Sequence, residues 1–279
     1  MSLDGAGAAA QTTSVGLIER LGIATIAAAL SGAAFAADDA PICPDRPSKG
    51  TGTCTVPAGQ WQIETGLVDW THDKSDGVTD EFVALGASLI KYGVDDRIDV
   101  EVGVVPFQTM RVHGGGVSDR MSGIGDLVVR SKVRLTGEDA KVSIAVDPFV
   151  KIPTARHNLG DGKVEAGMTV PVGVSLGGPL SLGFAPELDW RADADGHGHH
   201  AAMVQLIDLG IAASSKLSLT AELWRQWDWD PAGTGKQASA DGAVAYLVSN
   251  SLQIDGGANF GLNRTTPNLE LYAGVSARF

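Results

Sequence analysis

Residues 127–135 read LVVRSKVRL, and in this stretch apolar and charged side chains alternate. Leu127, Val129, Val133 and Leu135 occupy one set of positions, whereas Arg130, Lys132 and Arg134 occupy the other. An alternation with a period of two is typical of a β-strand whose two faces meet different surroundings. The stretch therefore predicts a strand with one apolar face and one charged face.

The same alternation recurs along the chain after residue 58. Seven clean segments lie at 98–104, 127–135, 142–152, 168–176, 180–190, 252–262 and 269–279. Five segments fit less well, namely 60–71, 79–92, 199–213, 216–229 and 237–249. Residues 199–213 fit worst, because Leu206 and Ile207 are adjacent apolar residues. The pattern predicts about twelve strands, each near or above the 9–11 residues that a tilted strand needs to cross a bilayer.

The segments that join these strands are alternately long and short. The long connections are 72–78, 113–121, 154–163, 192–198 and 230–236, and the short ones are 93–96, 136–139, 177–178, 214–215 and residue 250. An up-and-down meander with short turns at one end and longer loops at the other is typical of an outer-membrane barrel, whose turns face the periplasm. An even number of strands places both ends of such a barrel on the periplasmic side.

Alternation alone does not separate a membrane barrel from a soluble β-sandwich, but the aromatic residues favour the barrel. The apolar stripes contain few aromatics, while Trp61, Trp190, Trp227 and Trp229 stand near strand ends. Tryptophan is enriched at both membrane–water interfaces, where it forms an aromatic girdle. Trp70 also lies near a strand end, but its place in the alternation predicts an inward side chain.

The charge pattern of the apolar faces also favours a barrel. No clean segment places Lys or Arg on its apolar face, where it would cost about 2–4 kcal/mol at the middle of the bilayer. Backbone groups find no water partners in lipid, so a membrane sheet must close on itself. We therefore predict an all-β fold, a transmembrane antiparallel up-and-down barrel of about twelve strands at residues 59–279.

The composition excludes several classes of function. The 279 residues include 33 acidic and 21 basic ones, which gives a formal net charge of -12 at pH 7. This balance argues against nucleic-acid binding, which needs clustered Lys and Arg. We find no Walker loop, GxSxG elbow, HExxH or GxGxxG motif, and the six histidines fall in or beside the predicted outer loops. We predict no enzyme activity, no catalytic residue and no cofactor.

The N-terminal segment has the features of a signal peptide. Residues 21–30 read LGIATIAAAL, an apolar run that is too short to span a membrane. The tripeptide Ala34-Phe35-Ala36 then fits the small-x-small cleavage pattern. We predict that residues 1–36 are a signal peptide that is removed on export.

The stretch after the predicted cleavage site contains both cysteines of the chain. In an oxidising compartment, Cys43 and Cys54 predict a disulfide, and a free pair or a redox site are the alternatives. Four prolines in residues 37–58 deny this stretch regular secondary structure. It forms either a loose periplasmic leader or a plug that folds into the barrel, and in a plug Asp45 and Arg46 would pair with lumen charges.

The charged faces predict which residues line the lumen. If the strands of residues 98–104 and 127–135 are neighbours, an acidic row lies beside a basic row. Such rows either orient a polar or anionic solute by their field or brace the wall as ion pairs. The predicted lumen charges are Asp99, Glu101, Asp126, Arg130, Lys132, Arg134, Lys141, Asp147, Lys151, Glu187, Asp189, Arg191, Glu222, Asp255, Glu270 and Arg278.

Residues 193–200 read DADGHGHH and contain side chains that bind metals. His197, His199 and His200, with the nearby Asp193 and Asp195, are weak candidates for ligands of Zn, Ni or Cu. Histidines separated by glycine in an acidic outer loop are more often simply solvated. We therefore predict no metal site in this loop.

Short stretches spread from residue 45 to residue 279 resemble the outer-membrane "transporter" family named for the MetA pathway of phenol degradation. They are DRP at 45–47, CTVPAGQWQIETG at 54–66, GIGDL at 123–127, PFVKIPT at 148–154, TPNLE at 266–270 and the terminal Phe279. The resemblance implies a barrel in the outer membrane of a Gram-negative bacterium that takes up small solutes, among them aromatic or hydrophobic compounds. It implies no binding-site residue.

The last alternating segment ends on Phe279, which resembles the assembly signal of bacterial outer-membrane barrels. The expected partners are the lipid bilayer, lipopolysaccharide, the barrel-assembly machinery and a small-molecule solute, and no nucleic acid is expected. Two alternatives to a channel stay open. One is a structural or adhesive barrel with an occluded lumen, and the other is an exported soluble β-sandwich or lipocalin-like binder.

Overall fold

The computed structural model describes residues 40–137, 140–156 and 159–279. The predicted signal peptide (1–36) and the first residues of the predicted leader (37–39) lie outside the described residues. The strands are β1 (Trp61–Ser75), β2 (Val78–Asp95), β3 (Ile98–Val104), β4 (Phe107–Gly114), β5 (Val117–Gly123), β6 (Leu127–Arg134), β7 (Val142–Ile152), β8 (Glu165–Thr169), β9 (Val172–Gly177), β10 (Leu180–Ala192), β11 (His199–Ala212), β12 (Leu217–Asp228), β13 (Gly235–Ser249), β14 (Leu252–Gly261) and β15 (Leu269–Arg278). Among the described residues, no helix is long and apolar enough to cross a membrane.

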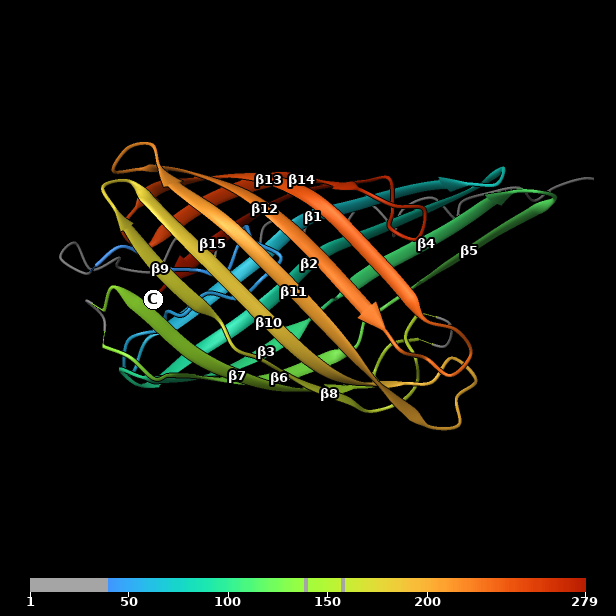
Figure 1. Ribbon diagram of the computed structural model, residues 1–279, viewed down its shortest axis with the longest axis horizontal. Coiled ribbons are helices and arrows are strands. Elements are labelled where there is room, and N and C mark those ends of the chain that lie inside the picture. Colours follow the sequence, from blue (N-terminus) through green and yellow to red (C-terminus); the bar gives the residue numbers. More distant parts are fainter. Residues whose placement is uncertain (1–39, 138–139, 157–158) are drawn as a thin grey trace, which may run out of the picture. The chain divides into compact units, whose positions relative to one another are not determined.

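These fifteen segments correspond to twelve strands of the barrel, because three barrel strands are each interrupted once and so consist of two segments. The segments are labelled in Figure 1. β3 and β4 both pair with β2, on either side of a break at residues 105–106. β8 and β9 both pair with β7 and β10, around a break at residues 170–171. β5 pairs with β4 and β6 pairs with β3, on either side of a break at residues 124–126. Pro106 and Pro171 stand in two of the breaks, where a missing N–H interrupts the ladder.

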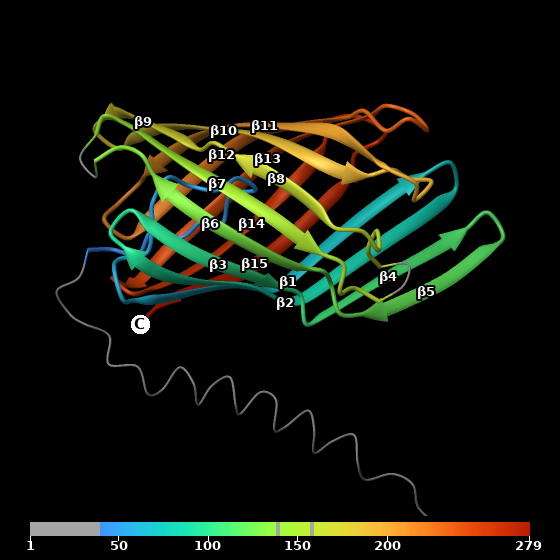
Figure 2. The same cartoon turned by 90° about the horizontal axis from the view of Figure 1, so that it is seen from below.

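The strands pair in antiparallel fashion along the chain, and the last strand returns to the first. β1 pairs with β15 from Gln62↔Arg278 to His72↔Leu269, and its other edge pairs with β2. The sheet is therefore closed into a barrel, which two perpendicular views show (Figure 1, Figure 2). The predicted all-β, up-and-down antiparallel barrel of twelve strands is confirmed, and the soluble β-sandwich is wrong.

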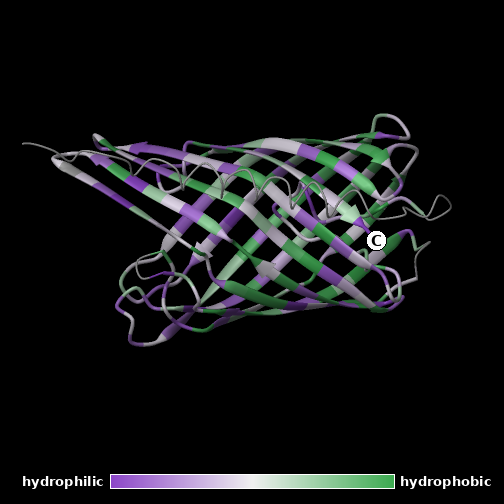
Figure 3. Ribbon diagram, turned by 180° about the vertical axis from the view of Figure 1, so that it is seen from behind, coloured by the Kyte–Doolittle hydropathy of each residue, from purple (hydrophilic) through white to green (hydrophobic). Residues whose placement is uncertain are grey.

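The barrel wall has an apolar outer face and a charged inner face, which is the opposite of a soluble protein. Asp99 and Lys132 are 0% exposed, whereas Val100 and Val129 on the same strands are 44% and 41% exposed. Hydrophobic and hydrophilic residues alternate along many strands of the wall (Figure 3). The aliphatic rows thus face outward, and the charged rows face the lumen. A charge buried in this way must find a partner inside the barrel.

The connections differ between the two ends of the barrel. Four connections of two to four residues lie at one end, at residues 96–97, 178–179, 213–216 and 250–251, and residues 135–141 make the fifth connection at that end. This end, where β15 finishes, is termed the turn end, and the opposite end is termed the loop end. In outer-membrane barrels the short turns face the periplasm, so the turn end is the periplasmic one.

Two of the predicted long loops are wrong, because residues 72–78 and 113–121 extend strands instead. β1 and β2 continue to a two-residue turn at Asp76-Gly77, whose φ angles are 50° and 80°. β4 and β5 meet in the same way at Gly115-Gly116, with φ of 57° and 87°. Positive φ at both central positions is typical of type I′ hairpin turns. The polar residues of these stretches therefore belong to two hairpins that project at the loop end (Figure 1).

Most tryptophans named by the sequence lie on the outer face. Trp61, Trp190 and Trp229 are 50%, 53% and 46% exposed. Trp70 differs from its prediction, because its side chain faces outward. A β-bulge between Gly66 and Val68 shifts the alternation by one residue and places Trp70 opposite Leu271 of the outer face.

Candidate functional site

The lumen contains three cavities along the barrel. The outer cavity, about 470 Å³, reaches the loop end, where Asp230 lines it. The middle cavity, about 430 Å³, extends to Lys49, and the inner cavity, about 420 Å³, lies at the turn end beside Cys43 and Cys54. The outer and middle cavities have four lining residues in common, whereas the middle and inner cavities share none. The bore is therefore interrupted between the middle and inner cavities.

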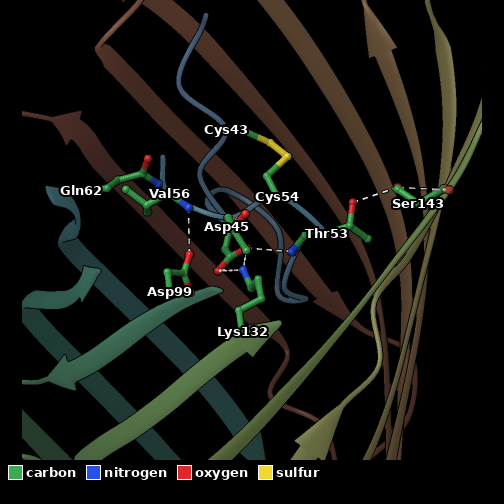
Figure 4. The surroundings of a disulfide bond; sticks show 12 residues. Cys43, Asp45, Thr53, Cys54, Val56, Gln62, Asp99, Lys132 and Ser143 are labelled. Carbon is green, nitrogen blue, oxygen red and sulfur yellow. Dashed lines mark hydrogen bonds and ion pairs between the residues drawn. A yellow bond between two sulfur atoms is a disulfide. The ribbon is translucent and has the colours of Figure 1, made fainter. Parts of the chain in front are cut away.

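The interruption is made by residues 40–58, the described part of the predicted leader, which are termed the leader. The leader starts at the turn end, where the Ile42 amide donates to the Asn250 carbonyl over 2.7 Å. It returns to the turn end before β1, where the Gly59 amide donates to the Gly93 carbonyl over 2.8 Å. Between these points it folds into the lumen, and Cys43 and Cys54 join its two arms through the predicted disulfide (Figure 4).

Asp45 is the centre of the charged contacts between leader and wall. Its carboxylate accepts a hydrogen bond from Nζ of Lys91 at 2.5 Å. It also accepts hydrogen bonds from Nζ of Lys132 at 2.7 and 2.9 Å (Figure 4). Both lysines are buried, and Glu64 and Glu101 complete the cluster at 2.7 and 3.6 Å from the Lys91 ammonium. Burial alone raises the pKa of Asp45, but the two ammonium groups lower that pKa by more, and it lies well below its usual range. Asp45 is therefore an anion at any physiological pH.

Arg46 forms the second anchor of the leader. Its Nη2 donates to Asp255 Oδ1 over 2.8 Å, and its guanidinium lies 5.8 Å from the centre of the Tyr272 ring. The Tyr272 hydroxyl donates to the Pro47 carbonyl over 2.9 Å. The strands β14 and β15 thus bind the leader through both a charged and a neutral hydrogen bond.

Lys49 forms the third anchor, deepest in the lumen. Its Nζ donates to Ser239 Oγ over 2.9 Å and lies 3.5 Å from Asp241. The same ammonium group lies 4.9 Å from the centre of the Trp224 ring, a cation–π contact.

Small residues let the leader approach the wall closely. A Cβ atom at Gly274 of β15 would lie 2.4 Å from Nε of Arg46, and one at Gly93 of β2 would lie 2.1 Å from the Pro57 carbonyl oxygen. On the leader side, a Cβ atom at Gly50 would lie 3.3 Å from Leu206. This contact explains the irregular alternation at 199–213, because Leu206 faces the lumen and packs under the leader.

The passage between the outer and middle cavities is lined by Val128, Arg130, Glu187 and Arg191. Arg191 donates from Nε and Nη2 to Asp189 Oδ2 over 3.0 and 2.7 Å. Arg130 lies 3.6 Å from an oxygen of Asp147, so both guanidinium groups are paired with wall carboxylates. Of the four residues that line both cavities, two are cationic and one, Glu187, is anionic.

The remaining predicted lumen charges fall into three places. Lys151 pairs with Glu165 at 2.7 Å and with Asp126 at 3.5 Å near the loop end, and also with Asp161. Glu222, Asp255 and Glu270 face the leader, and each lies within 4 Å of it. Arg134, Lys141 and Arg278 line the inner cavity at the turn end. Strand neighbours bring the predicted acidic and basic rows together, since Asp99 opposes Lys132 and Glu101 opposes Arg130.

Several residues of this interior were missed by the sequence analysis. Glu64, Lys91 and Asp241 lie on strands that alternate poorly, and Trp224 was not assigned to a face. Lys49 of the leader was missed as well, whereas Asp45 and Arg46 were expected to pair with lumen charges if the leader is a plug. The partners of these three residues are 18 to 221 residues away in the chain. The alternation of residues 60–71 and 79–92 contained the signal for Glu64 and Lys91, but the bulge near Gly66 obscured it.

The three histidines of residues 193–200 lie in different environments. His197 is exposed, and His199 stacks on Trp190 with ring centroids 3.7 Å apart. The Nε2 atom of His199 lies 2.8 Å from the Val164 carbonyl. His200 turns inward, toward Asp193. The sequence thus grouped three histidines that the fold separates.

A closed antiparallel sheet with an aliphatic outer face, a charged lumen and short turns at one end defines an outer-membrane β-barrel, a protein of the Gram-negative outer membrane. The family model described as "Putative MetA-pathway of phenol degradation" matches residues 44–279. The chain belongs to this family, as the sequence resemblance indicated.

Solved structures support the fold. An outer-membrane channel from Pseudomonas putida F1 superposes with a TM-score of 0.64 at 14% identity, over 81% of this chain and 98% of that chain. The transport unit of the autotransporter AIDA-I from Escherichia coli gives 0.51 at 10% identity, over 92% and 97%. The translocator domain of the autotransporter NalP from Neisseria meningitidis gives 0.50 at 12% identity, over 94% and 98%. No curated protein sequence matches the chain.

Proposed function

We propose that the protein is an outer-membrane channel for the uptake of small solutes, and that the leader is its plug. The observation that carries the proposal is the arrangement of the cavities. Two connected cavities open toward the loop end, a third lies at the turn end, and the leader lies between them. A segment held by side-chain contacts moves more readily than a strand of the wall, whose backbone is paired on both sides.

The lining of the middle cavity supports a small solute with both polar and apolar parts. Ala185, Val204, Leu206 and Trp224 form an apolar patch within it. Charged groups of both signs line the rest, so a single-sign ion pore is not favoured. Small aromatic compounds that carry a polar group fit this lining, and the description of the family, which concerns phenol degradation, supports the same class.

Planar-bilayer recordings test the proposal. A leader-release variant carries Asp45→Asn, Arg46→Gln and Lys49→Gln, which together remove the three anchors. We expect its conductance to exceed that of the unaltered protein several-fold, while Arg225→Gln, a change on the outer face, leaves conductance unchanged. If the unaltered protein and the release variant both insert stably but pass no current and no solute, the channel is refuted. The alternative, a structural or adhesive barrel with an occluded lumen, then holds.

The narrowing between the outer and middle cavities is the proposed selectivity filter. In the leader-release background, Arg130→Gln and Arg191→Gln each remove one positive charge from the passage. We expect each to shift the reversal potential in a KCl gradient toward that of potassium, because the carboxylate of Glu187 is left with less compensation. Arg225→Gln is the matched control, and equal reversal potentials in all variants would exclude this filter.

The remaining assignments are proposals that rest on the sequence. Residues 1–36 act as the signal peptide, residues 37–58 as the plug, and residues 59–279 as the barrel. The aliphatic outer face binds the bilayer, and its loop-end rim contacts lipopolysaccharide. The C-terminal strand, which ends at Phe279, binds the barrel-assembly machinery. The proposal is one of transport and includes no catalytic step.

A further inference from the structure

Three carboxylates surround a single imidazole at the loop end. The side chain of His200, the second residue of β11, is 7% exposed. Its Nδ1 lies 2.8 Å from Asp193 Oδ1 and 3.6 Å from Asp230 Oδ2. Its Nε2 lies 2.6 Å from Asp228 Oδ1. The four residues come from β11, from the end of β12 and from the two loops that follow β10 and β12.

The charges of this cluster do not balance. Even a protonated imidazole supplies one positive charge against three carboxylates. Arg191 lies 3.6 Å from Asp228 and offsets one more. In the part of the chain that the structure describes, no Lys or Arg nitrogen lies within 4.0 Å of Asp193 or Asp230. The cluster therefore retains an excess negative charge that favours a bound cation.

The contacts of His200 assign its two nitrogens. Nε2 and Asp228 Oδ1 are both buried and lie 2.6 Å apart, and neither makes a regular hydrogen bond to any other described group. A proton on Nε2 faces the Asp228 carboxylate, and in that tautomer the lone pair of Nδ1 is directed toward Asp193 and Asp230. Carboxylate–histidine–metal arrangements use the same device, in which the outer carboxylate fixes the tautomer of a histidine ligand.

The carboxylate of Asp230 is held in place by the backbone. Asp230 accepts hydrogen bonds from the amides of Ala194 at 2.7 Å and Ala232 at 2.6 Å, one on each carboxylate oxygen. Each oxygen keeps a second lone pair. A Cβ atom at position 198 would lie 2.4 Å from Asp193 Oδ2, so glycine there leaves room for the carboxylate.

We propose that Nδ1 of His200 and one carboxylate oxygen each of Asp193 and Asp230 bind a divalent transition-metal ion. These three atoms lie within 4.8 Å of one another. The Nδ1–oxygen distances are 2.8 and 3.6 Å. With metal–ligand bonds of about 2.1 Å, they correspond to ligand–metal–ligand angles of roughly 80–120°. One nitrogen and two oxygens suit Zn²⁺, Ni²⁺ or Co²⁺ and do not suit Ca²⁺, which takes six to eight oxygens. The ion ties the loop at 193–198 to the segment after β12 and adds positive charge at the mouth.

Titration of the detergent-extracted protein with ZnCl₂, after removal of metal with EDTA, tests the proposal by calorimetry. We expect one Zn²⁺ per chain in the unaltered protein and no measurable binding in His200→Ala. Asp228→Asn alters a positioning residue, so we expect Zn²⁺ affinity about 10–100-fold weaker. His197→Ala is the matched control, because His197 lies in the same loop but is exposed, and we expect unchanged affinity.

Three outcomes overturn the proposal. They are an absence of Zn²⁺ binding in the unaltered protein, unchanged affinity in His200→Ala, and an equal loss of affinity in His197→Ala. Heat-modifiable migration in gels shows whether each variant is a folded barrel. If His200→Ala does not fold, Asp230→Asn replaces it, because the asparagine keeps one oxygen for a backbone amide while removing the charge. Retained Zn²⁺ affinity in Asp230→Asn then refutes the site.

Discussion

At the scale of single residues, the interior is organised around one leader carboxylate. Lys91 and Lys132 are buried inside the wall, and a buried ammonium group is costly unless a carboxylate pairs with it. Asp45 receives hydrogen bonds from both. Its removal therefore weakens the leader and leaves two cations with fewer partners.

We predict that Asp45→Asn exposes the leader to trypsin. Cleavage after Lys49 requires the leader to leave its site, and hydrogen bonds between charged groups contribute about 1.5–3 kcal/mol each. A loss of about 2 kcal/mol corresponds to roughly 30-fold faster cleavage, because 1.4 kcal/mol is a factor of ten. Mass spectrometry of timed digests measures the rate. Asp119→Asn, an exposed position on β5, is the control, and equal rates in the two variants would contradict the role of Asp45.

Gly274 supplies a second prediction at this scale. A methyl group there meets Arg46, since its carbon would lie 2.4 Å from two guanidinium nitrogens. We predict that Gly274→Ala accelerates the same tryptic cleavage about tenfold, because Arg46 must give up its position beside Asp255. Gly242→Ala on β13 is the matched control, since no atom lies within 4 Å of its added carbon. Digests in which both alanine variants behave alike would rule out the close approach.

The inward charges of the regular strands could be predicted from the sequence, because a period of two fixes the face of every residue once one is known. Asp99, Glu101 and Lys132 are examples. The leader anchors could not be predicted in this way, since no period relates Arg46 to Asp255, which lies 209 residues later. The pairing of His200 with Asp228 and Asp230 likewise depends on β11 and β12 being neighbours.

At the scale of elements, the leader differs from the strands because it has no continuous backbone ladder to the wall. Its inserted part depends on side-chain anchors and on the disulfide that closes residues 43–54. All three anchors lie inside this disulfide loop, so the covalent link restricts the conformations that the free leader can adopt. In the chain-entropy view, a loop of this length contributes about 2–3 kcal/mol.

We predict that the double variant Cys43→Ser, Cys54→Ser releases the leader more readily. Tryptic cleavage after Lys49 should be roughly tenfold or more faster than in the oxidised protein. A reducing agent should reproduce this increase in the unaltered protein and have no effect on the double variant. If reduction changes neither the cleavage rate nor the bilayer conductance, the disulfide does not hold the leader in place.

The strand boundaries were predicted less well from the sequence than the strands themselves. The dipeptides Asp76-Gly77 and Gly115-Gly116 are strong hairpin signals, but the polar residues beside them favoured loops. Those hairpins project at the loop end, and a strand outside the bilayer needs no apolar face. Trp70 was misplaced for a different reason, because one bulge reverses the alternation for the rest of a strand.

At the scale of the whole molecule, the decisive property is the medium that each face of the wall meets. The outer aliphatic rows are exposed in the isolated chain, which is tolerable only where lipid covers them. The lumen holds the charges, and its ion pairs act as the core of the protein. Closure, alternation and composition of the strands all indicate this arrangement, so the barrel could be predicted from the sequence. The course of the leader through the lumen could not.

The outer face yields a depth-dependent prediction. Val129 lies in β6, several residues from the nearest turn, and its register neighbours Val102 and Val150 are also exposed. We predict that Val129→Arg lowers the free energy of unfolding in lipid vesicles by about 2–4 kcal/mol, because the guanidinium lies near the middle of the bilayer. The matched control is Val142→Arg, at the first residue of β7 beside the turn end, where the cost is about 0–1 kcal/mol. Reversible urea unfolding followed by tryptophan fluorescence measures both, and equal costs at the two depths would show that these rows do not face hydrocarbon.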